Sequence, residues 1–372
     1  MDKVIIYQRV LPHYRVPFFD LLYEKLLESG ISLRVVAGQE QNGAVPKTVF
    51  VDRPWVEYRK NIYLNFFGQE LVVQRFKCRD LIGATGIVVE QANRLLLNYF
   101  LILLSPFYKF RLGLWGHGKN FQSDKPQGIK ERFKSIVSKG YDFWFCYTDR
   151  GKEILAASGC CPHKIMVVRN SIDISEFEPV EDLRRRYSLQ SSIHDNVTAI
   201  FCGGMYAEKN IPFLLNAIGI IKEKLPNFQM LFIGDGPDSH LVNDYASNND
   251  WVKCVGYVSG PERIKYFSMS QIFLLPGLVG LAVLDSFAAQ VPMLTTDIKY
   301  HSPEIDYLVD GVNGKITVND AAVYAEEAIR ILSEPGYLET LKEGCRVSAQ
   351  EFSIDRMATN YSLGVLRMLG LD

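Results

Sequence analysis

A lysine and an aspartate, each a short distance after a glycine-containing loop, are the residues best placed to do chemistry in this chain. In residues 201–210, an apolar run passes through Gly203 and Gly204 to Lys209. Glycine lets the backbone approach a ligand closely, and the start of a helix attracts anions. Lys209 lies where a helix begins, a position that disfavours a cation. A phosphate bound there would resolve the conflict, and a solvated lysine is the alternative.

The second charged residue, Asp285, follows a loop that runs through Gly277 to Gly280 and Leu281. We expect free backbone amides at Gly280 and Leu281, opening a helix that carries Asp285 one turn later. Amides together with the helix dipole suit a diphosphate, and an acid one turn on suits a ribose diol. The alternative for Asp285 is a solvated acid near a helix start, where acids are favoured in any case.

Apolar runs of strand length, separated by helical patterns, predict two successive βα arrays with parallel sheets. The strands predicted in the first half are 4–8, 32–38, 86–90, 111–115, 143–147 and 164–168, and the helices 16–27, 71–80, 95–104 and 130–139. Those predicted in the second half are strands 197–202, 229–233, 252–258, 272–275 and 292–296, and helices 211–225, 240–246, 261–268 and 281–289. Residues 40–68 are expected to form an insertion or a hairpin, 170–196 a linker, and 321–369 a helical tail. The expected fold is α/β, with two Rossmann-like domains and a ligand cleft between their sheets.

The motifs of the second half, taken as a set, resemble family 4 retaining glycosyltransferases of the bacterial polysaccharide and O-antigen type, which have the GT-B fold. The family pattern is Gly-Arg-x5-Lys-Gly, then Gly-Asp-Gly-Pro, then Glu-x7-Glu, closing with Pro-Glu and Asn-Gly. Here the order and spacing match from about 197 to 316, including Gly234 in the second motif and Glu304 and Asn313 in the last two. The first half matches more loosely.

The resemblance implies a role for each matched position. It predicts a donor site at Gly203, Gly204, Lys209, Gly234, Val258, Gly277, Gly280, Leu281 and Asp285, with His117 and Lys209 as the catalytic residues. His117 lies between two glycines after a strand, at the sheet edge where ligands of α/β proteins bind; a structural histidine is the alternative. His13, Tyr14 and Arg15 in the first strand–helix turn are expected to face the cleft mouth and bind the acceptor, the alternative being surface residues that lead into a helix.

Two positions depart from the family pattern. Gly204 stands where the family usually has Arg, and Gly277 where it has the first Glu of Glu-x7-Glu. The missing Glu removes the usual acidic contact to the donor sugar, for which His301 or Glu304 are possible replacements. Asp285 takes the place of the second Glu.

The domains predicted from these patterns differ in charge. Residues 1–172, the expected acceptor domain, hold 25 Lys and Arg against 15 Asp and Glu, whereas the remainder holds 16 against 27, so the overall charge of −1 hides +10 and −11. The donor domain is expected at 173–352, and a final helix, about 353–372, is expected to cross back onto the first domain. Opposite charge suggests different partners.

A peripheral membrane contact is predicted from the first half. Residues 95–108 form an apolar run of about 14 residues, too short to span a bilayer. It adjoins a basic stretch, 109–139, with interleaved aromatic residues. These features fit an anionic bilayer surface better than single-stranded nucleic acid, with a solvated helix as the alternative for 130–139. No signal peptide is recognised at the first residues, and seven scattered Cys suggest reduced thiols.

These observations predict a cytoplasmic enzyme at the inner face of the cell membrane. It would move a sugar, with retention, from a UDP- or GDP-linked donor to a lipid-linked or polysaccharide acceptor in surface glycan or lipopolysaccharide biosynthesis. No metal and no cofactor beyond the nucleotide-sugar co-substrate is expected. The alternatives are a nucleotide-sugar epimerase of the same fold and a catalytically silent nucleotide-sugar binding subunit.

Overall fold

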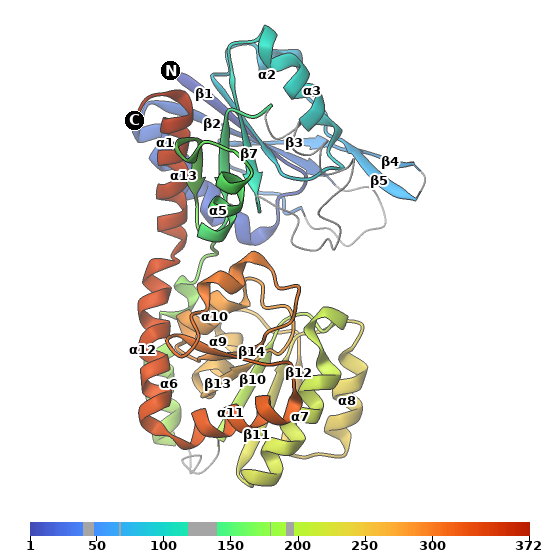
Figure 1. Ribbon diagram of the computed structural model, residues 1–372, viewed down its shortest axis with the longest axis vertical. Helices are drawn as coiled ribbons and strands as arrows, with labels where there is room; N and C mark the ends of the chain where they lie inside the picture. Colours follow the sequence, from blue (N-terminus) through green and yellow to red (C-terminus); the bar gives the residue numbers. More distant parts are fainter. Residues whose placement is uncertain (40–47, 67, 118–139, 179, 191–196) are drawn as a thin grey trace. The chain divides into compact units, whose positions relative to one another are not determined.

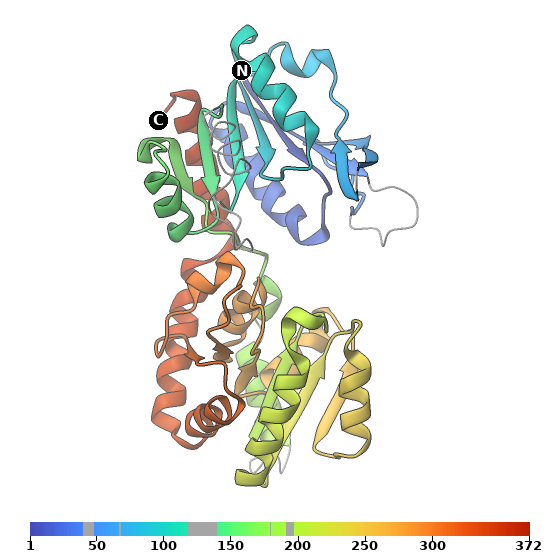
Figure 2. The same ribbon diagram turned by 45° about the vertical axis from the view of Figure 1, so that its right-hand side comes forward.

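The chain forms two compact α/β units. The computed structural model describes all residues except 40–47, 67, 118–139, 179 and 191–196. One unit comprises Met1–Asp173 with Ile354–Asp372, and the other Ile174–Ser353. Each is built on a parallel sheet (Figures 1 and 2). The predicted α/β class with two parallel sheets is confirmed.

The first unit is a seven-stranded parallel sheet with the order β3-β2-β1-β6-β7-β8-β9. Its strands are β1 (Asp2–Gln8), β2 (Ile31–Gln39), β3 (Val56–Lys60), β6 (Gly86–Glu90), β7 (Arg111–Gly116), β8 (Phe143–Cys146) and β9 (Ile165–Val167). Its helices include α1 (Val16–Glu28), α2 (Cys78–Leu81), α3 (Leu96–Leu104), α5 (Asp149–Ala157) and α13 (Ile354–Leu369). The chain builds outward from β1 to β3 and then from β6 to β9, so the strand order reverses between β1 and β6.

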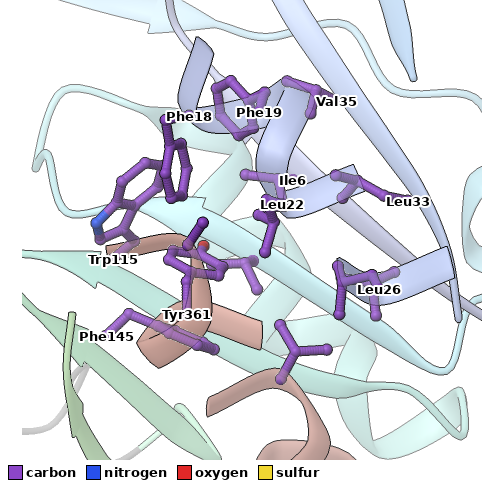
Figure 3. Close-up of a cluster of buried hydrophobic side chains, with 14 of the residues drawn as sticks. Ile6, Phe18, Phe19, Leu22, Leu26, Leu33, Val35, Trp115, Phe145 and Tyr361 are labelled. Atoms are coloured by element: carbon purple, nitrogen blue, oxygen red, sulfur yellow. The ribbon is translucent and has the colours of Figure 1, made fainter. Parts of the chain in front are cut away.

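The last helix, α13, packs beside α1 on this sheet (Figure 1). Close approach is possible because a Cβ at Gly364 would lie 2.7 Å from the ring of Phe145. Tyr361 of α13 is fully buried and stacks on Phe145, with ring centroids 4.4 Å apart. It also meets Trp115 edge-on at 5.0 Å, within the buried cluster of Figure 3. The C-terminal residues therefore complete the core of the unit that the N-terminus begins.

Replacing Tyr361 with Ala should lower the free energy of unfolding of this unit by about 3–5 kcal/mol, the usual cost of truncating a buried aromatic residue. Tyr361→Phe is the matched control, because the hydroxyl has no hydrogen-bond partner among the described residues. Urea unfolding followed by tryptophan fluorescence measures both, since Trp55, Trp115 and Trp144 all lie in this unit. Equal losses for the two variants would contradict the assigned packing.

The segment between β2 and β6 differs in part from the prediction. The predicted hairpin exists, as β4 (Ile62–Phe66) paired antiparallel with β5 (Gln69–Val73). The helix predicted at 71–80 is wrong, because its first part is β5 and only the four residues of α2 are helical. Strand β3 was not predicted, since its charged sequence lacks an apolar run.

A buried ion network explains how this charged strand joins the sheet. The Arg59 guanidinium donates to both oxygens of Asp80, at 2.5 and 3.1 Å, and to both of Glu57, at 3.0 and 2.9 Å. Tyr7 also donates to Asp80. Burial raises the pKa of Asp80, but the hydrogen bonds from Arg59 and from the Lys77 amide outweigh it, and the net pKa is about 2. The contacts with Asp80 join residues far apart in sequence, which is why apolar periodicity does not detect them.

The second unit is a six-stranded parallel sheet with the order β12-β11-β10-β13-β14-β15. Its strands are β10 (Val197–Cys202), β11 (Phe228–Ile233), β12 (Val252–Gly256), β13 (Ile272–Leu274), β14 (Met293–Thr296) and β15 (Gly314–Thr317). Its helices include α6 (Val180–Gln190), α7 (Ile211–Lys224), α8 (Ser239–Ser247), α9 (Gly260–Ser268), α10 (Ala282–Ala289), α11 (Ala321–Ser333) and α12 (Pro335–Glu351). The expected linker thus contains helix α6, and β15 was not predicted.

None of the described helices combines the length and the apolar character needed to cross a membrane. The seven cysteines are all free.

Candidate functional site

In the second unit, the strand order reverses between β10 and β13, so the loops that follow these strands meet at the carboxyl edge of the sheet. Ligands of open α/β sheets bind at such a switch point. The loop after β10 carries Gly203, Gly204 and Lys209, and the loop after β13 carries Gly277, Gly280 and Leu281. The fold therefore brings the two predicted glycine-rich motifs together.

Glycines are required where the loops after β10 and β11 cross. Gly234 has φ +126°, and a Cβ there would lie 1.9 Å from the carbonyl oxygen of Gly203. A Cβ at Gly236 would lie 2.3 Å from the carbonyl oxygen of Met205. At Gly204, by contrast, a Cβ would meet only the ring of Tyr206, at 2.9 Å. Backbone packing therefore requires glycine at positions 234 and 236. At position 204, the obstacle to a larger residue is a side chain that can move.

Gly277 permits the closest contact between the two loops. A Cβ at this position would lie 2.2 Å from the carbonyl oxygen of Glu208 and 2.6 Å from Cα of Lys209. The next amide, of Leu278, donates to the same Glu208 carbonyl at 2.8 Å. No side chain fits at 277 without a shift of the backbone, so the departure from the family pattern is built into this loop arrangement.

The buried Lys209 side chain also stabilises the contact between the two loops. Its Nζ donates to the carbonyl oxygens of Leu278 at 2.5 Å and Val279 at 3.5 Å. Burial lowers the pKa of Lys209 to about 8. An ammonium has three N–H donors, so these two carbonyls leave one for an anion. Lys209 belongs to the short 3₁₀ turn Ala207–Lys209, which precedes α7.

The amide of Gly280 is not free, contrary to the prediction, because it donates to the hydroxyl of Ser302 at 2.9 Å. Gly280 itself has φ +61° and open space where a Cβ would stand. Leu281 caps the N-terminus of α10. Ser302 was not predicted from the sequence. The bond ties the loop after β14 to the loop after β13. The Leu284 amide donates to the Leu281 carbonyl at 3.0 Å, so an anion would meet the earlier amides of the first turn of α10.

Asp285 is buried on α10 and shares an arginine with a second acid. Its Oδ2 accepts from Arg263 of α9 at 3.0 Å, and Arg263 also pairs with Glu176. The other oxygen, Oδ1, is buried without a hydrogen-bond partner among the described residues. Burial raises the pKa of Asp285, and Arg263 opposes that rise. A buried carboxylate oxygen is costly to leave unpaired, so Oδ1 is suited to accept from a ligand hydroxyl.

The two residues proposed to replace the missing Glu lie in the same edge of the sheet. His301 Nε2 lies 2.7 Å from the carbonyl oxygen of Thr296, while Nδ1 is buried with no partner in the described part of the chain. Burial lowers the pKa of His301, and the nearby charge of Lys209 lowers it further. Glu304 is buried. Val258 is half-buried and follows β12, two strands from the switch point.

The first unit has its own cavity at the corresponding place, between the ends of β1 and β6. It measures about 210 Å³ and includes the exposed His117, whose ring meets Tyr147 edge-on at 4.6 Å. A Cβ at Gly116 would lie 2.3 Å from Cβ of Gln91, so this glycine is needed for the strand ends to meet. The remaining lining residues are Arg9, Glu90, Gln91, Ala92, Arg94, Leu95 and Trp115.

The three residues predicted to bind the acceptor do not share one environment. His13 is exposed and Tyr14 half-buried, whereas Arg15, which was expected to face the cleft mouth with them, is buried. Its guanidinium donates to Asn170 Oδ1 at 2.6 Å and lies 5.1 Å from the Trp115 ring. The amide oxygen and the aromatic ring stabilise the buried guanidinium in place of solvent. Arg15 therefore ties α1 to the segment after β9.

Comparison with known proteins shows what this arrangement is similar to. Residues 196–334 match the family model "Glycosyl transferases group 1". Over the whole chain, the fold is similar to that of sucrose-phosphate synthase from Thermosynechococcus elongatus, with a TM-score of 0.70, 15% identity and 100% of both chains covered. It is also similar to Anabaena Alr3699/HepE in complex with UDP, with a TM-score of 0.66, 12% identity, and 98% and 99% of the two chains covered. The fold is GT-B, as predicted.

Sequence relatives agree with this class. The chain is 25% identical to alpha-monoglucosyldiacylglycerol synthase of Acholeplasma laidlawii over 182 residues, 47% of this chain and 44% of the relative. It spans about half the length of the curated relatives it matches. The resemblance stated from the motifs is confirmed by the match of residues 196–334 to the group 1 glycosyl transferase model.

Replacing Gly277 with Ala should lower the free energy of unfolding of the second unit by about 1–3 kcal/mol, because the added methyl overpacks a backbone contact. Gly336→Ala on α12 is the control, since nothing lies within 4 Å of its Cβ position. That change should be neutral or stabilising by about 1 kcal/mol at most. Chemical denaturation measures both, and an unchanged Gly277→Ala protein would contradict the tight loop contact.

Proposed function

We propose that the protein is a retaining glycosyltransferase. It transfers a sugar from a nucleoside diphosphate sugar, UDP- or GDP-linked, to a lipid-linked or polysaccharide acceptor in surface glycan or lipopolysaccharide biosynthesis. The observation that carries the proposal is the buried, unpartnered Oδ1 of Asp285 at the start of α10, beside the switch point between β10 and β13. The group 1 family match and the similarity to a fold captured with UDP support it.

The donor would bind across the two loops of the second unit. The ribose hydroxyls would donate to Asp285 Oδ1, and the diphosphate would lie at the first turn of α10, where the helix dipole favours negative charge. Lys209 would give its remaining N–H to the leaving diphosphate, whose charge grows as the glycosidic bond breaks. His301 or Glu304 would contact the donor sugar in place of the absent Glu.

The transfer would proceed with retention. The acceptor hydroxyl would attack on the face that the diphosphate leaves, and a phosphate oxygen would take its proton. His117 of the first unit would orient the sugar, and His13 and Tyr14, as the more accessible members of the predicted set, would contact the acceptor. Metal independence and the absence of a cofactor remain predictions. Among the described residues, no three His, Cys, Asp or Glu side chains are grouped to hold a metal ion.

Incubation with a panel of UDP- and GDP-sugars tests the proposal. A transferase should slowly release the free nucleoside diphosphate from one donor. Interconversion of the sugar would support an epimerase instead, and tight binding without turnover a silent binding subunit. Gly204 and Gly277 give the silent subunit its main support, because both lack the charged side chains of the family pattern.

In a titration with the nucleoside diphosphate, Lys209→Met should weaken binding by about 10- to 100-fold, since hydrogen bonds to charged groups contribute roughly 1.5–3 kcal/mol. Asp285→Ala should also weaken it, and Lys224→Met, an exposed lysine at the end of α7, is the control. Because the pKa of Lys209 is about 8, Lys209 is charged below that pH. Nucleotide affinity should therefore fall as the pH rises through 8, and this dependence should vanish in Lys209→Met. Unchanged affinity in both site variants would refute the donor site.

The acceptor would be reached at an anionic membrane surface. On and after α3, the side chains of Phe100, Leu103 and Phe107 are 38%, 70% and 81% exposed, next to the exposed Lys109. Apolar side chains beside basic ones suit the headgroup region of an anionic bilayer. Most of the predicted basic stretch, 118–139, lies outside the described residues. Nucleic acid is not proposed as a partner, and a cytoplasmic location at the inner membrane face remains part of the proposal.

The protein should co-sediment with vesicles of anionic phospholipid at low salt, and less so at high salt, because salt screens charge attraction. Leu103→Asp with Phe107→Ser should reduce binding several-fold. Val347→Ser, which alters another exposed apolar residue, on α12, should leave vesicle binding unchanged. Vesicle binding that is the same for all three proteins would contradict this surface assignment.

A further inference from the structure

The cavity of the first unit has a chemistry that His117 alone does not account for. Two arginines, Arg9 and Arg94, line it together with a single acid, Glu90. They come from the two sides of the switch point, since Arg9 directly follows β1 and Glu90 ends β6. The site is therefore built where the fold places ligands, and from residues that are far apart in sequence.

Glu90 is fixed in place by its neighbours. Its Oε2 accepts from the Arg9 amide at 2.5 Å, and its own carbonyl accepts from Asn98 of α3 at 2.8 Å. Burial raises the pKa of Glu90, while Arg9, Arg15 and Arg94 oppose the rise. A carboxyl group held this way is suited to accept hydrogen bonds from hydroxyls without dominating the charge of the cavity.

The cavity also presents unused hydrogen-bonding capacity. The indole Nε1 of Trp115 is buried without a partner among the described residues, and Trp115, itself 3% exposed, lines the cavity. A buried donor left unpaired is unfavourable, so a ligand acceptor atom at this place would be stabilising. Arg94 pairs with Glu70 at 3.2 Å, but both side chains are more than 40% exposed. An exposed pair of this kind is weak, and Arg94 can exchange Glu70 for an oxyanion.

We infer that this cavity binds a sugar residue of the acceptor that carries an oxyanion, a carboxylate or a phosphate. Arg9 and Arg94 would hold the oxyanion, Trp115 Nε1 would donate to a ring or hydroxyl oxygen, and Glu90 would accept from a hydroxyl. Its assignment to the acceptor rests on the proposed function.

Size and charge both favour this ligand. A volume of about 210 Å³ is below the roughly 300–1,000 Å³ of sites for drug-sized ligands, which leaves room for one sugar ring rather than a nucleotide. Two arginines against one glutamate give the lining a positive balance. Guanidinium groups also match carboxylate and phosphate oxygens geometrically.

Isothermal titration calorimetry of the full chain at low salt, without nucleotide, tests the inference with three probes: glucose, glucuronate and glucose 6-phosphate. At least one anionic sugar should bind tenfold or more tightly than glucose, and whether glucuronate or the phosphate is preferred identifies the oxyanion. Arg94→Gln should remove at least tenfold of this preference. Its exposed side chain makes misfolding an improbable cause, and circular dichroism verifies the fold.

Arg79→Gln, which removes an exposed arginine of α2 outside the cavity, is the matched control and should bind all three probes as the unmodified protein does. Equal affinity for glucose and both anionic sugars would overturn the inference, as would a preference that survives both Arg9→Gln and Arg94→Gln. UDP is titrated in parallel. Binding of UDP without preference for anionic sugars overturns this inference alone, whereas anionic-sugar binding without UDP binding supports the cavity and contradicts the proposed donor site.

Discussion

The backbone contact at Gly277 is the constraint on which the candidate donor site depends. Because no Cβ stands there, the loop after β13 lies against Glu208 and Lys209, with the Leu278 amide 2.8 Å from the Glu208 carbonyl oxygen. This proximity brings the carbonyls of Leu278 and Val279 to Lys209 Nζ and so permits the lysine to be buried. Burial in turn lowers the pKa of Lys209 towards physiological pH. One missing side chain thus helps to set the position and the lowered pKa of Lys209.

Both units have their candidate site at a reversal of strand order, but the residues at the two sites differ in chemistry. In each sheet the strand order reverses once, between β1 and β6 or between β10 and β13, and the candidate residues follow the strands on either side. In the second unit these loops are held by backbone packing and by one lysine. In the first, they surround a cavity with two arginines, an acid and an indole. The common fold explains where the sites lie, and the loop sequences explain what each is suited to bind.

Much of this could be predicted from sequence, because it depends on local patterns. Apolar runs identified the strands that flank both switch points, and glycine spacing identified the loops after β10 and β13. What the sequence did not reveal depends on contacts between distant residues. The Gly280 amide, which was expected to be free, donates a hydrogen bond to Ser302. Arg15 is buried in contact with Asn170 and Trp115. Strand β3 pairs with β2, and its buried Arg59 is neutralised by the distant Asp80. In the sequence, Glu90 is only the last residue of a predicted strand. Its contact with Arg9 is evident only from the fold.

The departures from the family pattern are consistent with anion binding once local charge is considered. The portion of the chain from residue 173 onward has a formal charge of −11, which would repel a diphosphate if spread evenly. At the switch point, however, Asp285 is paired with Arg263, and Arg263 is shared with Glu176. Gly277 contributes no carboxylate, whereas the family pattern has an acid there. Arg263 offsets one of its two carboxylate partners, and Lys209 with the first turn of α10 supplies local positive charge for a diphosphate. Without an acid at position 277, the site lacks the family's contact to the donor sugar. It also lacks a negative charge that would repel the diphosphate.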